Sequence, residues 1–192
     1  AQLDEDAGEN GRLLLIVLDA VGLAAWSVIA PIWQQADMFG GQSLRVALAS
    51  LPTLTSVSRL AIFDGKLSLD LRQWAASDKA QLERARWRER FAERDNRCAA
   101  YRAGDQGLLD ALRQGVPRLA LVDTSWDERM HHLAPQFEPL AAAAATWAQV
   151  KAAQIRPILT EALQGGYRVV VTSDHGHVQA RGTGNVPGKG AL

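Results

Sequence analysis

One stretch of the sequence decides the fold: Tyr167-Arg-Val-Val-Val-Thr-Ser-Asp174-His175-Gly176-His177. Three consecutive valines follow the Gly165-Gly166 pair, and this pattern predicts a short buried strand of a parallel sheet. A carboxylate and two imidazoles come directly after the strand. Because ligands of open α/β sheets bind outside the carboxyl ends of the strands, these side chains indicate a site. A polar loop with incidental histidines is the alternative interpretation.

Further strands and helices are predicted along the rest of the chain. Two apolar runs, Arg12–Leu18 and Val116–Val122, each end in an aspartate and read as buried strands. Hydrophobic periodicity or composition adds a strand over 43–49 and helices over 23–33, 57–63, 78–97, 105–114 and 136–164. Pro31 should break or kink the first helix, and Pro157 is a candidate kink in the last. Alternating strands and helices predict an α/β three-layer sandwich with a largely parallel central sheet.

The bulk composition is that of an ordinary globular protein. A chain of 192 residues with 47% hydrophobic residues predicts one domain with a real core. The formal net charge of zero gives no general attraction to nucleic acid or anionic membranes. A lone cysteine, Cys98, excludes an internal disulfide framework, and no apolar run is long enough to span a bilayer, so we expect a cytoplasmic protein. We expect residues 1–10 and 183–192 to be flexible, in a domain excised from a longer protein.

A hydroxyl-rich loop, Leu51-Pro-Thr-Leu-Thr55-Ser56, leads into the short helix predicted over 57–63. Thr55 or Ser56 would lie at the helix N-terminus, where free amide protons favour an anion. A simple N-cap is the alternative, since serine and threonine are common there. The helix over 78–97 carries charges of both signs at helical spacing, which is typical of a solvated face.

The four histidines of the chain fall in two groups beyond the ends of predicted strands: His131 with His132, and His175 with His177. Three aspartates share the same edge: Asp19, Asp127 and Asp174. One helical turn would bring Asp127 next to His131. Mixed carboxylate and imidazole ligands suit Zn²⁺ or Mn²⁺. One or two such ions could support displacement at phosphorus, with Thr55 as the attacking alkoxide.

At these residues the chain resembles the alkaline phosphatase superfamily, and most closely its PglZ branch. Three segments and the intervening Asp127…His131 carry the resemblance: Leu15-Ile-Val-Leu-Asp19-Ala-Val-Gly22, Leu51-Pro-Thr-Leu-Thr55-Ser-Val-Ser-Arg59-Leu60, and Val170-Val-Thr-Ser-Asp174-His175-Gly176-His177-Val178. The resemblance covers most of residues 12–182 and implies an alkaline-phosphatase-like core. Sulfatases share that fold but need a modified Cys/Ser-x-Pro-x-Arg segment, which the surroundings of Cys98 do not provide.

Carried over by position, the resemblance implies that Asp19, Asp174 and His175 hold one metal. It implies that Thr55 is the nucleophile or a bridging ligand, with Thr53 as an alternative. Asp127 and His131 would hold a second metal, with Asp123 and His132 as alternatives. The superfamily uses a further histidine downstream, so we expect either that His177 takes that place or that the ligand has been cut off from this chain. Arg59 could contact a phosphate or form a surface ion pair.

PglZ proteins belong to bacteriophage exclusion (BREX) and phage growth limitation systems. The resemblance therefore implies an antiviral defence component beside methyltransferase and ATPase partners. A phosphodiester, with nucleic acid among the candidates, would suit a phosphoesterase site, although the neutral charge adds no support for DNA binding. The competing hypothesis is a catalytically degenerate scaffold module of a defence complex. A phosphomutase ranks last, because the insert over 65–105 is too short for a large cap domain.

Overall fold

The computed structural model describes residues 11–38, 44–51, 53–66, 79–92, 97–132 and 139–177. Our expectations for the two ends of the chain, residues 1–10 and 183–192, lie outside these residues. No helix in the described ranges is long and apolar enough to cross a membrane.

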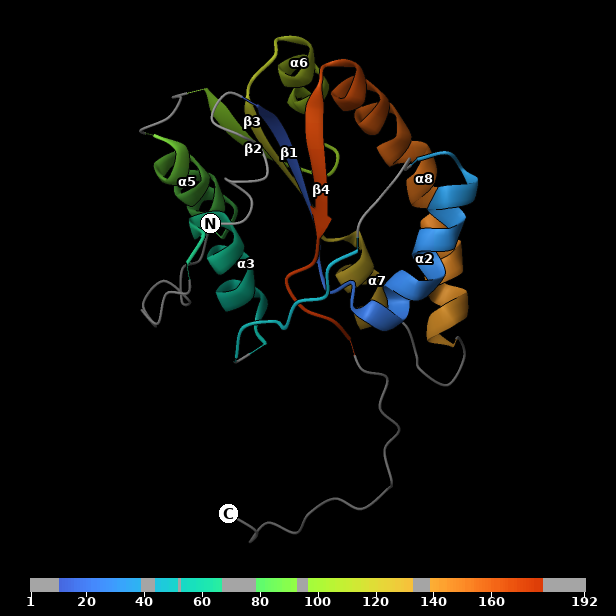
Figure 1. Ribbon diagram of the computed structural model, residues 1–192. Coiled ribbons are helices and arrows are strands. Elements are labelled where there is room, and N and C mark those ends of the chain that lie inside the picture. Colours follow the sequence, from blue (N-terminus) through green and yellow to red (C-terminus); the bar gives the residue numbers. More distant parts are fainter. Residues whose placement is uncertain are drawn as a thin grey trace, which may run out of the picture.

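A parallel sheet of four strands forms the centre of the described structure (Figure 1). The strands, in the spatial order β2-β3-β1-β4, are β2 (Cys98–Arg102), β3 (Arg118–Asp123), β1 (Arg12–Leu18) and β4 (Tyr167–Thr172). Because all four run the same way, the residues that follow their carboxyl ends lie along one edge of the sheet.

Helices cover both faces of this sheet, which confirms the predicted three-layer α/β arrangement (Figure 1). One face packs against α2 (Leu23–Gln35), α6 (Gly107–Arg113), α7 (Ser125–His132) and α8 (Leu140–Gln164). The other face packs against α3 (Thr55–Asp64) and α5 (Lys79–Phe91). Successive residues of β1 alternate between the two cores, with Leu14 and Ile16 on the first face and Leu13 and Leu15 on the second.

The structure corrects several details of the predicted elements. Residues 44–49 contain no strand, and Leu48 in this segment is 97% exposed, so the strand predicted over 43–49 is wrong. The described sheet instead contains β2, a strand that was not predicted, because its short sequence Cys98-Ala-Ala-Tyr-Arg favours a strand only weakly. The valines of β4 are only partly buried, because this strand lies at one end of the strand order. Neither Pro31 in α2 nor Pro157 in α8 ends its helix.

A close contact between two glycines joins the loops that follow β1 and β4. A Cβ atom added to Gly176 would lie 2.7 Å from the Cα atom of Gly22, and one added to Gly22 would lie 2.9 Å from the Cα atom of Gly176. Both distances are shorter than side-chain contacts allow, so only glycine fits at either position. The contact keeps the residues after β1 against the residues after β4.

We predict that Gly176→Ala lowers the free energy of unfolding by about 1 to 3 kcal/mol, because the new methyl group must push one loop backbone away from the other. Chemical denaturation followed by circular dichroism measures this change. A stability within about 0.5 kcal/mol of the unsubstituted protein, as is usual for surface substitutions, would show that the loops are not in tight contact.

Candidate metal centre

The strand register places two aspartates side by side at the carboxyl edge of the sheet. Val17 of β1 pairs with Thr172 of β4, and Asp19 and Asp174 each lie two residues further along. Both carboxylates are buried. A parallel register therefore brings together two charged groups that are 155 positions apart in the sequence.

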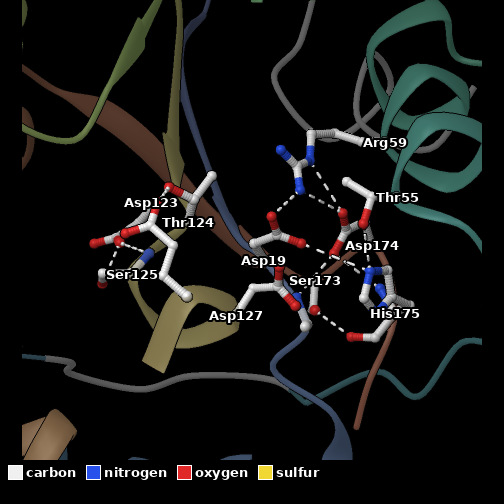
Figure 2. A network of polar contacts seen from close by, with 12 residues as sticks. Asp19, Thr55, Arg59, Asp123, Thr124, Ser125, Asp127, Ser173, Asp174 and His175 are labelled. Carbon is white, nitrogen blue, oxygen red and sulfur yellow. Dashed lines mark hydrogen bonds and ion pairs between the residues drawn. The ribbon is translucent and has the colours of Figure 1, made fainter. Parts of the chain in front are cut away.

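Asp19, Asp174 and His175 form a compact set of ligand atoms. One oxygen or nitrogen atom from each residue lies within 4.8 Å of the other two, and no other such group of His, Cys, Asp or Glu occurs among the described residues. Thr55 Oγ1, at the start of α3, lies 2.7 Å from His175 Nε2 (Figure 2). The structure thus joins one predicted metal triad to the predicted nucleophile.

Asp174 is held by the backbone around it. Its Oδ1 atom accepts hydrogen bonds from the amides of Ala20 at 3.0 Å and His175 at 2.9 Å. Ala20 adopts a left-handed conformation with φ of 61°, which a residue other than glycine rarely adopts and which costs about 1 to 3 kcal/mol. The hydrogen bond to Asp174 is one interaction that offsets this strain, so the turn after β1 is shaped by the site.

Arg59 of α3 lies between the two carboxylates (Figure 2). Its side chain is 3% exposed, and it forms ion pairs with Asp19 and, at 3.0 Å, with Asp174 Oδ2. The surface ion pair considered for Arg59 is therefore wrong. Burial alone would lower the pKa of Arg59, but the attraction of the surrounding carboxylates outweighs burial and the pKa is raised.

A further buried acid, Glu83 of α5, continues this charged network. Glu83 Oε1 lies 3.5 Å from Arg59 Nη1, and Glu83 Oε2 accepts a 2.6 Å hydrogen bond from Arg102 at the end of β2. A solvated charged face was expected for helix α5, whereas Glu83, which that expectation did not include, is 4% exposed. The network links β2, α5 and α3 to the candidate centre.

The atoms available at the centre suit a divalent cation. Asp19 Oδ1 is buried, has no hydrogen-bond partner among the described residues, and lies 3.6 Å from His175 Nε2. A carboxylate oxygen buried without a donor is costly, and a cation is one group that would satisfy it. The donor set of two carboxylates and one imidazole matches the preferences of Zn²⁺ and Mn²⁺.

The residues predicted to hold a second metal lie around Asp127 on α7. Asp127 Oδ1 lies 2.9 Å from His177 Nε2, and Asp127 Oδ2 lies 3.4 Å from His131 Nε2. The rings of His175 and His177 are 6.1 Å apart, so the two groups adjoin. The second group is more open, with the His131 side chain 70% exposed.

The alternative residues considered from the sequence lie elsewhere. Asp123 accepts hydrogen bonds from the backbone and hydroxyl of Ser125 (Figure 2). It also pairs with Lys151 at 2.8 Å, so it supports the start of α7 and the packing of α8. Thr53 and His132 are exposed. Thr55 is the first residue of α3, whereas Leu54 is the N-cap and makes no side-chain cap bond, so the interpretation of Thr55 as an N-cap is wrong.

The sequence predicted the acidic and imidazole groups but not the buried cation or its partner. Arg59 lies one turn after Thr55 in a helix that packs against the sheet, and this proximity was the available signal. Glu83 had no signal, because its burial depends on how α5 packs beside α3.

Fold and site define the class of protein: an α/β domain with buried carboxylates and partly exposed imidazoles at the carboxyl edge of a parallel sheet, as in alkaline-phosphatase-like proteins. The sequence matches, over residues 3–192, the family described as the BREX system PglZ alkaline phosphatase-like domain. The chain belongs to this PglZ family, and the expected family and fold are confirmed. It is a component of a BREX defence system, which implies other defence proteins beside it. A search of curated proteins found no match.

The pKa of Asp19 is raised from its ordinary value of 3.8 to about 6. Burial is the main cause, the negative charges of Asp174 and Asp127 add to it, and Arg59 opposes it. A folded-state pKa above the unfolded value means that the bound proton stabilises the fold below about pH 4. This contribution is lost as the pH rises through about 6.

We predict that the metal-free protein loses stability relative to Asp19→Asn as the pH rises from 5 to about 7, because only the unsubstituted protein must bury the ionised carboxylate. Unfolding in urea with a chelator, at several pH values, measures the difference between the two proteins. A difference that stays constant over this range would contradict the raised pKa of Asp19.

Proposed function

We propose that this domain is a metal-dependent phosphoesterase that acts on a phosphomonoester or phosphodiester. The observation that supports this proposal best is the contact between Thr55 Oγ1 and His175 Nε2, which joins a hydroxyl to the compact metal triad. In this proposal Asp19, Asp174 and His175 hold a Zn²⁺ or Mn²⁺ ion. The ion would favour loss of the Thr55 proton and neutralise charge at the phosphoryl group.

Thr55 is the nucleophile in this proposal. Its oxygen forms a new bond to phosphorus while the bond from phosphorus to the leaving alkoxide breaks, and water later releases the phosphoryl group from Thr55. Thr55 is also the first residue of α3, where unpaired backbone amides and the helix dipole favour a negatively charged phosphoryl group.

Asp127, His131 and His177 would hold a second ion beside the first. Their contacts through Asp127 support this role, and His177 then takes the place of the further histidine that the superfamily uses. The more exposed position of this group implies weaker binding than at the triad.

The domain would work beside the methyltransferase and ATPase components of a BREX system, with nucleic acid among the candidate phosphodiesters. We also propose that the elements described here act as one domain and that the protein is cytoplasmic, as its single cysteine favours.

A non-catalytic scaffold is the second candidate. One observation favours it: Arg59 already forms ion pairs with both Asp19 and Asp174, so a cation other than a metal ion lies between these carboxylates. A scaffold role would leave Thr55 without a chemical function.

We predict that Thr55→Val lowers phosphoester hydrolysis by about a thousandfold or more, because the attacking oxygen is lost while the side-chain shape is kept. Release of p-nitrophenol from p-nitrophenyl phosphate and bis-p-nitrophenyl phosphate, with Zn²⁺ or Mn²⁺ present, measures this. The matched control is Thr53→Val, an exposed threonine two positions earlier, which should retain activity.

Equal activity in Thr55→Val and Thr53→Val would exclude Thr55 as the nucleophile. Metal binding without hydrolysis of either substrate would favour the scaffold. Asp123→Asn serves as a further control: it should lower stability but leave metal affinity unchanged, since Asp123 is bonded to Ser125 and Lys151.

A further inference from the structure

The candidate centre contains a positive charge of its own. The guanidinium of Arg59 pairs with Asp19 and with Asp174, which are the two carboxylates of the compact triad. All three side chains are at least nine-tenths buried. Arg59 therefore occupies, in electrostatic terms, the position that a divalent cation would take.

Asp19 and Asp174 are buried side by side and cannot both stay ionised without a nearby cation, because the repulsion between two negative charges is strong where water is excluded. Arg59 supplies that cation through a planar group that contacts both aspartates, by its Nη2 atom in each case and by Nε as well at Asp174. A divalent ion held by Asp19 Oδ1 and the rest of the triad would be repelled by the nearby guanidinium, which pairs with the Oδ2 atoms of both aspartates. Metal and Arg59 therefore compete for the same negative charge.

We propose that Arg59 is a resident counter-cation that sets the metal affinity of this centre, and that Glu83 is the positioning residue that gives Arg59 a partner outside the triad. The proposal builds on the proposed metal site but does not require hydrolysis. In the metal-free protein Arg59 keeps Asp19 and Asp174 together, and binding of the ion weakens those two ion pairs.

Glu83 gives Arg59 a third partner that is not part of the triad. Glu83 contacts Arg59 through Nη1, whereas Asp19 contacts it through Nη2. Its other oxygen is fixed by Arg102. When a metal ion takes the charge of the aspartates, Arg59 retains the ion pair with Glu83, so the guanidinium stays buried with a partner.

The test measures Zn²⁺ and Mn²⁺ affinity by calorimetry, together with the thermal stability of the metal-free protein. We predict that Arg59→Gln raises the affinity by at least about tenfold, because one repelling charge is removed, and that it lowers the Tm of the metal-free protein. Arg59→Lys, which keeps the charge but cannot bridge both aspartates, should bind metal with intermediate affinity. The control is Arg113→Gln, which removes an exposed ion pair with Glu161 and should change neither quantity appreciably.

Glu83→Gln tests the positioning role through a double-mutant cycle. We predict that Glu83→Gln weakens metal binding by about threefold or more when Arg59 is present. Arg59 then has no partner besides the triad in this network, so it competes more strongly with the metal ion. The effect should largely disappear in the Arg59→Gln background, because Glu83 acts through Arg59. An equal effect in both backgrounds would overturn the assignment of Glu83.

A fall in metal affinity in both Arg59→Gln and Arg59→Lys would overturn the proposal that Arg59 competes with the metal ion. Arg59 would then help to hold the metal ligands in place. If Arg59→Gln is unfolded without metal, refolding at saturating Zn²⁺ supports the proposal, and failure to refold contradicts it. Tighter metal binding without phosphoester hydrolysis would uphold this inference while rejecting the proposed function. Hydrolysis by the unsubstituted protein, together with an unchanged metal affinity in Arg59→Gln, would uphold the proposed function and reject this inference.

Discussion

The structure depends on how the buried charges of Asp19 and Asp174 are balanced. Parallel pairing of β1 and β4 brings the two carboxylates together, and the Gly22–Gly176 contact keeps their loops in place. Two ionised groups in this position would destabilise the fold unless a cation lies between them. Arg59 is that cation in the structure described here. Both carboxylates therefore have a partner without metal, and the centre still carries the ligand atoms that a metal needs.

This balance explains why the centre extends beyond the sheet edge. Thr55 and Arg59 lie one turn apart on α3, so the same helix supplies the candidate nucleophile and the counter-charge. Glu83 and Arg102 connect that helix to α5 and β2. Residues outside the recognisable motifs thus contribute to the electrostatics of the site. This arrangement is compatible with a hydrolase of tuned metal affinity, and also with a scaffold that keeps the acidic groups for structural reasons.

The sequence predicted those features that follow from local pattern. Continuous apolar runs gave β1 and β3, and the aspartates that end them could be placed at one edge because parallel strands share that edge. The apolar segment near Leu48 has the composition of a strand but lies exposed and without strand pairing, whereas the weakly patterned residues after Cys98 pair with β3. Strand pairing and the burial of Glu83 depend on tertiary packing, which no local pattern encodes.

The most direct test of this account is to locate the first metal ion by anomalous X-ray scattering from crystals grown with Zn²⁺. We predict that the ion bound at the lowest concentration is held by Asp19, Asp174 and His175, next to Thr55. A first ion bound only at Asp127, His131 and His177, with the Arg59 ion pairs intact and the triad empty, would contradict it.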